Sequence, residues 1–258
     1  MPVASNVRDL ESNRDNRTGE LPINELFYSL QGEGKLAGVP SVFIRTAGCN
    51  LRCWFCDSYH TSWEPAGEWL AVDDIIEEVL SYEAAEHVVL TGGEPMMHEK
   101  SAELLEQLSG YGFHTTVETN GTIYRDTAID LASISPKLAS STPTSNRDPK
   151  GNGEWAERHE ERRTDMAALT KIIDSYDSQL KFVVTSAEDI PEINDLINRL
   201  RTATTTRLQD DDVLLMPEGM TRDDLDTVRN EVAELAIEHG YRYTPRLHVD
   251  LWNDAAGT

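Results

Sequence analysis

The chain has 258 residues, and its 46 acidic side chains outnumber its 23 basic ones to give a formal net charge of −23. So negative a surface repels the phosphates of nucleic acids and anionic membranes, which argues against direct binding to either. Hydrophobic residues make up 39% of the chain and no apolar run is long enough to span a bilayer, so we expect a cytoplasmic protein. Because only six of the basic residues are lysine, and because salt screens charge repulsion, the composition also favours a halophilic source.

The first 20 residues are polar and acidic, unlike a secretory or transit peptide, and we expect them to form a flexible leader. Residues 21–258 are enough for a single domain with a hydrophobic core of its own. Within that domain, residues 139–161 are first rich in Ser, Thr, Pro, Asn and Gly and then strongly charged. This change of composition predicts a polar insertion at the surface, for which the sequence indicates no role.

Stretches that alternate like strands and stretches with the spacing of amphipathic helices follow one another along this domain. We predict strands over residues 22–30, 41–46, 87–91, 114–118, 133–135, 180–184, 213–216 and 246–251. We predict helices over residues 72–82, 100–108, 128–131, 166–176, 190–200 and 223–239. This order is typical of a parallel sheet with helical crossovers. About six parallel strands are too few for a closed barrel, so we expect an α/β fold with a partial, open (β/α) TIM-like barrel.

All three cysteines of the chain, Cys49, Cys53 and Cys56, follow the second predicted strand in the spacing C-x3-C-x2-C. Thiolates in this number on one short loop can bind three corners of a cubane 4Fe–4S cluster. No fourth cysteine exists, so one iron would have no protein ligand, as a catalytic cluster requires. Zinc, with His60 as a fourth ligand, is the alternative, although structural zinc sites usually divide their ligands into two separated pairs.

Turns of unusual composition directly follow the predicted strands. They are residues 31–33, 49–58, 92–95, 118–120, 135–137 and 216–219. Because ligands collect at the carboxyl ends of parallel strands, we expect these turns to converge on one rim of the barrel. Their convergence would indicate an active site more strongly than any single motif.

Two of these turns carry groups suited to small ligands. The adjacent glycines Gly92 and Gly93 allow a ligand to approach closely, and Glu94 supplies a carboxylate that could face an ammonium group. Asp57 and Ser58 offer hard oxygen ligands of the kind that Mg²⁺ prefers. An ordinary turn in the first case and a helix cap in the second are the alternatives.

Two cations at strand ends each have a functional and a structural interpretation. Arg45, at the end of the second strand, could hold a substrate carboxylate with both arms of its guanidinium group, or could pair with one of the many acidic residues. Lys137, directly after another strand, could reach a carboxylate or a ribose hydroxyl, or could be an ordinary surface lysine.

The sequence contains LQGEG at residues 30–34, FIR at 43–45, GCNL at 48–51, CWFCDS at 53–58, TGGEP at 91–95, ETNG at 118–121 and SPK at 135–137. Taken together, these segments resemble the 7-carboxy-7-deazaguanine synthases, a family of radical S-adenosylmethionine (SAM) enzymes. The resemblance implies that 6-carboxy-5,6,7,8-tetrahydropterin is converted to 7-carboxy-7-deazaguanine with release of ammonia, in the 7-deazapurine biosynthesis that leads to archaeosine or queuosine. The radical would come from SAM bound to the open iron, so no catalytic acid or base is implied.

The resemblance also implies the binding residues. Those around SAM would be Phe55, Cys56, Asp57, Gly93, Ser135, Pro136, Lys137, Met216, Pro217 and Glu218. Those around the pterin would be Leu30, Gln31, Gly32, Glu33, Arg45, Thr91, Glu118 and His248. Ser58 would bind a Mg²⁺ ion that also contacts the substrate.

Partners follow from the same resemblance. An external electron donor of the flavodoxin or ferredoxin type would reduce the cluster, and the protein would be a homodimer. Two alternatives stay open from the sequence: another radical SAM enzyme, such as an activase that makes a glycyl radical on a protein partner, and a non-enzymatic iron–sulfur or zinc module.

Overall fold

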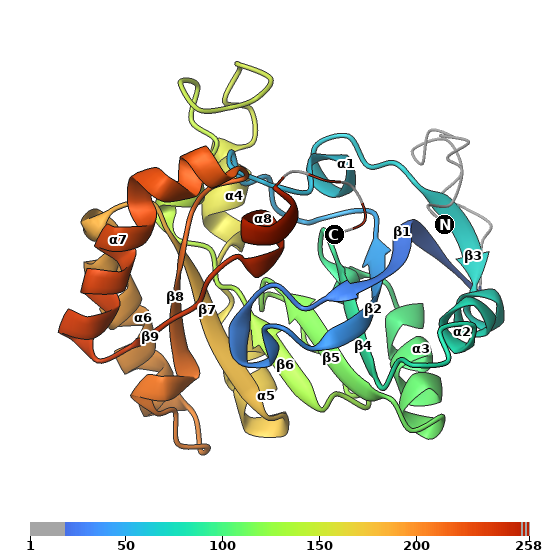
Figure 1. Cartoon of the computed structure of the whole chain (residues 1–258). Helices are drawn as coiled ribbons and strands as arrows, with labels where there is room; N and C mark the ends of the chain where they lie inside the picture. The colour runs from blue at the N-terminus through green and yellow to red at the C-terminus, as the bar shows by residue number, and fades with distance from the viewer. Residues whose placement is uncertain (1–18, 254, 256, 258) are drawn as a thin grey trace.

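The computed structural model of the protein describes residues 19–253, 255 and 257, so nearly all of the predicted leader lies outside the described residues. Within them, nine strands form one sheet in the order β3-β1-β2-β4-β5-β6-β7-β8-β9 (Figure 1). The strands are β1 (Glu20–Leu30), β2 (Pro40–Thr46), β3 (Glu68–Ala71), β4 (His87–Gly92), β5 (His114–Thr119), β6 (Leu131–Ile134), β7 (Ser178–Val184), β8 (Val213–Pro217) and β9 (Arg242–Tyr243).

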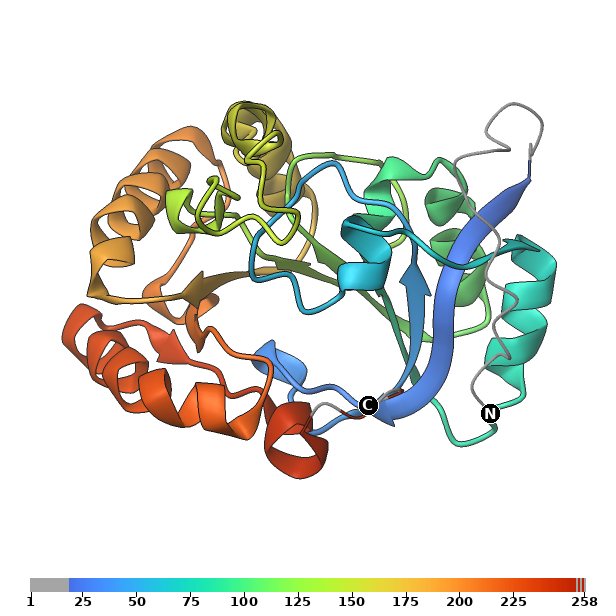
Figure 2. The same ribbon diagram turned by 90° about the horizontal axis from the view of Figure 1, so that it is seen from above.

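Helices α2 (Val72–Leu80), α3 (Lys100–Gly110), α5 (Met166–Ser175), α6 (Ile190–Ala203) and α7 (Arg222–His239) cover the convex side of this curved sheet (Figures 1 and 2). The shorter helices α1 (Tyr59–Ser62), α4 (Ala156–Arg162) and α8 (Leu247–Trp252) lie toward the upper end of the barrel in Figure 1. Short 3₁₀ turns include η2 (Gly34–Leu36), η3 (Pro95–Met97) and η4 (Ala139–Ser141). In the part of the chain that the structure describes, no helix is both long and apolar enough to cross a membrane.

Strand β2 and strands β4 to β9 run parallel to one another, whereas β1 is antiparallel to β2 and to β3. The edge strands β3 and β9 do not pair, so the barrel is open and the predicted fold class is confirmed. The antiparallel direction of β1 follows from its connection. Residues 31–39 are too few for a helical crossover, and Gly38 instead donates its N–H to the carbonyl of Gln31 at 2.7 Å in a tight return.

Local sequence signals define α7 well. The Thr221 hydroxyl accepts a hydrogen bond from the N–H of Asp224, and the Asp224 carboxylate accepts one from the N–H of Thr221, which forms a capping box. The helix ends at Gly240, whose φ of 73° is a left-handed conformation that glycine adopts without steric cost. The predicted start and end of this helix are therefore close to the observed ones.

Two predicted elements are wrong. No helix forms at residues 128–131, because Asp130 bends the chain by accepting hydrogen bonds from the N–H and hydroxyl of Thr115 just before β6. Residues 247–252 form helix α8 rather than a strand. The alternation of Leu247, Val249 and Leu251 suggested a strand with one buried face, but only Val249 is buried and Leu251 is 47% exposed. The last strand is instead the short β9.

Alternate residues of the strands face opposite sides of the sheet, one set toward the helices and the other toward the centre of the barrel. Leu180, Phe182 and Val184 of β7 point outward into a hydrophobic core shared with α5, α6 and α7. Val88 and Leu90 of β4 belong to a second core with α2 and α3. The residues between them face inward, toward the centre of the open barrel. The sequence pattern therefore leaves the inner face free for polar side chains.

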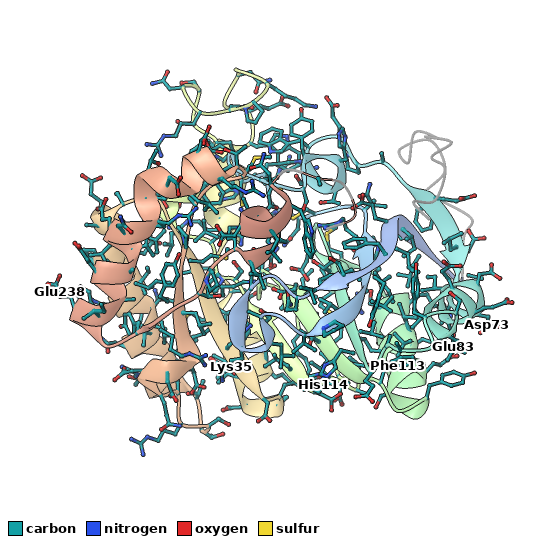
Figure 3. The ribbon with its side chains drawn as sticks, in the orientation of Figure 1. Lys35, Asp73, Glu83, Phe113, His114 and Glu238 are labelled. Atoms are coloured by element: carbon teal, nitrogen blue, oxygen red, sulfur yellow. The ribbon has the colours of Figure 1, made fainter. Side chains whose placement is uncertain are left out.

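Much of the negative charge extends from the outer helices and turns into solvent. Asp73, Glu83 and Glu238 are exposed at the periphery of the molecule (Figure 3). Such carboxylates repel one another and are screened by dissolved salt.

Candidate active site

The turns after the strands meet around one cavity of about 590 Å³ at the carboxyl end of the barrel. Most of the predicted site residues line it: Leu30, Gln31, Gly32, Glu33, Arg45, Cys49, Cys53, Phe55, Cys56, Asp57, Ser58, Thr91, Gly93, Glu118, Ser135, Lys137, Met216, Glu218 and His248. Pro136 and Pro217 do not line it and are buried. The predicted convergence of the turns is thus present in the fold.

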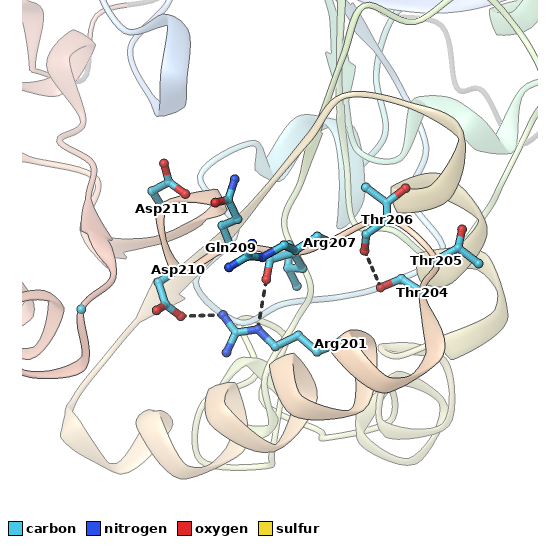
Figure 4. Close-up of a pocket in the computed structure, with 10 residues that line it drawn as sticks. Arg201, Thr204, Thr205, Thr206, Arg207, Gln209, Asp210 and Asp211 are labelled. Atoms are coloured by element: carbon cyan, nitrogen blue, oxygen red, sulfur yellow. Dashed lines mark hydrogen bonds and ion pairs between the residues drawn. The ribbon is translucent and has the colours of Figure 1, made fainter.

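A second hollow, of about 790 Å³, lies where α6 is connected to β8 and contains none of the predicted site residues (Figure 4). Arg201 in this hollow binds the carboxylate of Asp210 at 2.5 Å and the carbonyl of Leu208 at 3.1 Å. The hollow lies at the amino end of β8, whereas ligands of such barrels bind at the carboxyl ends. Its position therefore does not suit an active site.

The three sulfur atoms line the cavity at the carboxyl end of the barrel as free thiols. Cys49 Sγ accepts a hydrogen bond from the N–H of Leu51 at 3.4 Å, and Cys56 Sγ accepts one from the hydroxyl of Ser62 at 3.1 Å. The indole of Trp63 donates to the carbonyl of Cys53 at 2.9 Å and fixes the loop from below.

Burial raises the pKa of Cys49 and of Cys56, and raises that of Cys53 to about 12, with the Lys137 ammonium opposing the shift at Cys53. Thiolates in this position therefore need more positive charge than the protein provides, and bound iron would supply it. Among residues 19–253, 255 and 257, no three Cys, His, Asp or Glu side chains converge on a single metal ion. The three cysteines line one cavity, and a cubane binds each sulfur through a different iron, so the donor set fits a cluster.

The diglycine turn approaches the cysteine loop closely. A Cβ atom on Gly93 would lie 2.3 Å from the carbonyl oxygen of Gly48 and 2.8 Å from Cβ of Cys49, so only glycine fits. The backbone of this turn faces the cavity.

The side chain of Glu94, the residue after the two glycines, does not face the cavity. Glu94 is fully buried and accepts hydrogen bonds from the hydroxyl of Thr119 at 2.9 Å and from the N–H of Asn120 at 2.7 Å and of Met96 at 3.0 Å. Burial raises the pKa of Glu94 to about 7, although the hydrogen bonds to its oxygens act to lower it. The expectation that this carboxylate faces an ammonium group is wrong, because its oxygens are used to tie η3 to the end of β5.

Arg45 lines the cavity and is held by two side-chain contacts. Its Nε donates to Glu25 at 3.0 Å, in the ion pair that the acidic composition suggested. Its Nη1 donates to the hydroxyl of Ser58 at 2.9 Å, and that hydroxyl donates to the Asp57 carboxylate at 3.1 Å. Ser58 makes no side-chain cap on α1, so the capping alternative is absent there.

The floor of the cavity is a network of buried ion pairs. Lys181 Nζ donates to Glu33 at 2.6 Å and to Glu118 at 2.9 Å, and its side chain is only 4% exposed. Arg246 donates to Glu33 at 3.0 Å and also binds Asp57. These contacts connect β5, β7, the turn after β1, the cysteine loop and the segment before α8.

Pairing dominates the electrostatics of this floor. Burial alone would raise the pKa of Glu33, but the charges of Lys181 and Arg246 outweigh it and hold the pKa well below the usual range. Burial alone would lower the pKa of Lys181, but Glu118 and Glu33 outweigh it and raise that pKa. Glu33, Lys181 and Arg246 are therefore ionised at neutral pH.

Comparisons with known proteins agree with this geometry. Residues 43–140 match the radical SAM superfamily. The chain is 66% identical over 258 residues to the 7-carboxy-7-deazaguanine synthase of Halobacterium salinarum, with all of both chains covered. It is 41% identical over 251 residues to that of Rhodopirellula baltica, which covers 96% of this chain and 93% of the relative. The crystal structure of QueE from Escherichia coli superposes with a TM-score of 0.64 at 26% identity, covering 89% of this chain and 95% of that one.

The chain belongs to the 7-carboxy-7-deazaguanine synthases. The resemblance inferred from the motifs is confirmed, as is the assignment to the radical SAM enzymes. The similarity to a relative from Halobacterium also fits the halophilic composition. These comparisons give no support to a glycyl-radical activase or to a zinc module.

In this synthase, the motifs alone did not assign a role to Lys181 or Arg246. A signal for Lys181 was present, because it is a single cation inside the apolar strand sequence LKFVV at residues 180–184. A buried strand admits such a residue only where it is paired. Arg246 gave no comparable signal, since its partners lie far away in the sequence, at residues 33 and 57.

The insertion also contacts the cysteine loop, which the sequence did not indicate. His159 of α4 is fully buried, and its Nδ1 accepts the N–H of Arg52 at 3.2 Å. The Nε2 atom therefore carries the proton and donates to the hydroxyl of Ser141 at 2.9 Å. Burial lowers the pKa of His159 to about 4, which keeps the ring neutral and this arrangement intact at neutral pH.

Proposed function

We propose that this protein converts 6-carboxy-5,6,7,8-tetrahydropterin to 7-carboxy-7-deazaguanine and ammonia, the activity that its family name implies. One observation carries the proposal: the three cysteines, the diglycine turn and the ion-paired floor all line the same cavity. A reaction in which a radical formed at one wall acts on a substrate held at another needs such a shared chamber, so that the two reacting groups are held close together.

Cys49, Cys53 and Cys56 would hold the 4Fe–4S cluster, and the backbone of Gly93 together with Lys137 would hold SAM beside it. Phe55, Ser135, Met216 and Glu218 also line this side of the cavity. When bound, the cluster and SAM supply the 5′-deoxyadenosyl radical that starts the reaction. The protein's part is to orient the reactants, because cofactors carry the chemistry.

The pterin would lie over the charged floor. Glu33 and Glu118 carry carboxylate oxygens suited to accept from the amide and amino N–H groups of a pterin ring, and both already accept a hydrogen bond from Lys181. Arg45 would approach the substrate carboxylate, with Glu25 fixing its Nε and leaving the rest of the guanidinium group oriented by Ser58.

A Mg²⁺ ion at Ser58 belongs to this proposal. The hydroxyl of Ser58 and the carboxylate of Asp57 are adjacent and line the cavity, and such oxygens suit an ion that also takes ligands from its substrate. Arg45 and Arg246 now occupy these oxygens in part, so the ion would have to share or displace their hydrogen bonds.

Three further features of the proposal rest on the family alone. They are a homodimeric assembly, a cytoplasmic location and an external electron donor of the flavodoxin or ferredoxin type. The absence of a membrane-spanning helix among the described residues is compatible with the location.

The test is anaerobic reconstitution with iron and sulfide, followed by incubation with SAM, a reductant and 6-carboxy-5,6,7,8-tetrahydropterin. The proposal predicts SAM-dependent formation of a deazapurine, detected by its ultraviolet absorption and mass, and no product from Cys53→Ala. Cleavage of SAM without any deazapurine would instead assign the protein to another radical SAM reaction.

A further inference from the structure

A cluster of arginines and tryptophans lies on the outer side of the cysteine loop, and we refer to it as the arginine–tryptophan face. It consists of Arg52 and Trp54 from the cysteine loop and Arg147, Trp155 and Arg158 from the insertion. The guanidinium groups of Arg52 and Arg158 lie 4.3 and 4.7 Å from the ring centre of Trp155. That of Arg147 lies 5.4 Å from the ring centre of Trp54. Cation–π contacts of this kind hold the side chains in place.

Two residues of this face flank a cysteine directly in the sequence. Arg52 and Trp54 are the sequence neighbours of Cys53, and neither lines the cavity, whereas Cys53 and Phe55 do. The ring of Trp54 meets the edge of Phe55 with 5.2 Å between their centres. The loop therefore presents its sulfur atoms inward and the arginine–tryptophan face outward, with one layer of residues between them.

The insertion holds this face rigidly. The indole of Trp54 donates to the carbonyl of Ser140 at 2.7 Å, and its backbone N–H donates to Ser141 at 3.2 Å. His159 fixes the N–H of Arg52 at 3.2 Å. Seen from above, residues 139–163 stand beside the cysteine loop (Figure 2). A preorganised surface loses little entropy when a partner binds.

Its charge differs from that of the rest of the molecule. Residues 139–163 contain five basic and five acidic side chains and are therefore neutral, within a chain of net charge −23. Arg163 is paired with Glu160 and Glu192. Arg147 and Arg158 are exposed, and among the described residues no carboxylate lies within ion-pair distance of either. They are available cations on a surface that otherwise repels acidic proteins.

We propose that the arginine–tryptophan face is the docking surface for a small acidic redox protein that delivers single electrons to the cluster. This rests on the proposed function, because it assumes a cluster on the three cysteines. One electron passes from the reduced carrier to the oxidised cluster, so the carrier is oxidised by one electron, the cluster is reduced by one, and no bond or proton changes. Trp and Arg are enriched among the residues that anchor protein interfaces, and the guanidinium groups of Arg147 and Arg158, which have no carboxylate partner among the described residues, attract an acidic partner.

The test compares Arg147→Glu/Arg158→Glu with Arg207→Glu. Arg207 is an exposed arginine in the loop before β8, beside the second hollow and at the other end of the barrel (Figure 4). The probe is a recombinant acidic flavodoxin. Its affinity for the cluster-free protein is measured by surface plasmon resonance at about 0.15 M KCl and at higher salt.

The double variant should bind flavodoxin at least about tenfold more weakly, a difference that shrinks as KCl rises, while Arg207→Glu binds as the unaltered protein does. With reconstituted enzyme, product formation driven by reduced flavodoxin should fall to a similar extent. Product formation driven by dithionite, which needs no docking surface, should stay within about twofold. Thermal unfolding checks that both variants are folded.

Equal flavodoxin affinity in all three proteins would overturn the proposal. An equal loss of activity with dithionite would also overturn it, because the arginines would then act on the active site itself. A changed oligomeric state of the double variant would overturn it too, because the face would then bind a second copy of the chain. Failure of the unaltered enzyme to form product with dithionite would refute the proposed function, and the binding measurement would still decide the docking surface.

Discussion

The two walls of the active-site cavity hold their charge in opposite ways. On the cysteine wall, burial raises the pKa of all three thiols, and the surrounding protein does not compensate. On the floor, burial also disfavours the charged forms of Glu33 and Lys181, but the two opposite charges lie 2.6 Å apart and both groups stay ionised. The floor is thus complete in the protein alone, whereas the cysteine wall is complete only with a metal group.

Removing one sulfur should have the largest effect, because it acts on the wall that depends on the cofactor. Cys53→Ala should lose bound iron and reduce product formation by at least about 1,000-fold, since a cluster held by two thiolates is not retained. The iron and sulfide content of the protein measures the loss of the cluster, and an assay of product formation measures the loss of activity. The unfolding free energy of the cluster-free protein should change by less than about 2 kcal/mol, as a small buried side chain is shortened. Retention of a full cluster would contradict this.

Removing the cation of the floor should instead affect the protein itself. Lys181→Met leaves Glu33 and Glu118, whose side chains are only 14% and 18% exposed, with one counter-charge fewer, and should lower the unfolding free energy of the cluster-free protein by about 3–5 kcal/mol. The matched control is Lys35→Met, whose ion pair with Asp212 is 21–30% exposed and should contribute less than about 1 kcal/mol. Equal effects in urea unfolding would show that the floor is no more preorganised than the surface.

The difference between Lys181→Met and the unaltered protein should depend on pH. Because the pKa of Glu33 is lower in the folded protein than in the unfolded chain, its contribution to stability is complete above the ordinary value of 4.5. It is lost as pH falls below that value and the carboxylate is protonated. Urea unfolding at a series of pH values should therefore show the two proteins becoming more alike in acid. A difference that stayed constant from pH 7 to pH 3 would mean that packing, not charge, stabilises the floor.

A smaller effect should follow from changing the support of the cysteine wall. His159→Ala leaves the N–H of Arg52 without its acceptor and should lower the unfolding free energy by about 1–3 kcal/mol. Glu238→Ala, at an exposed position of α7, should change it by less than about 0.5 kcal/mol. If His159→Ala were as neutral as this control, the insertion would not be holding the loop.

The sequence predicted most of the inner face of the barrel and less of what stabilises it. Cysteine spacing, paired glycines and turns after strands are local signals, so the cavity-lining residues Cys49, Gly93 and Ser135 could be found from the sequence. Pro136, two residues after β6, and Pro217, the last residue of β8, are buried outside the cavity. The motifs did not distinguish these buried prolines from the neighbouring residues that line the cavity.

Long-range pairs could not be predicted in this way. The Glu94 carboxylate is bound by residues at the end of β5, and nothing near residue 94 indicates that these groups would reach it first. The contact between His159 and Arg52 joins residues 107 positions apart. Such contacts depend on how the elements pack, and the low complexity of the insertion hid its role beside the cysteine loop.

The central claim is that the cysteine wall holds a cluster with one open iron, directly beside the diglycine turn. Electron paramagnetic resonance of the reconstituted, reduced protein tests it most directly, with and without SAM. The account predicts the signal of a reduced 4Fe–4S cluster, a clear change in that signal when SAM is added, and no signal from Cys53→Ala. A signal that SAM leaves unchanged, or a colourless protein that binds zinc instead of iron, would contradict it.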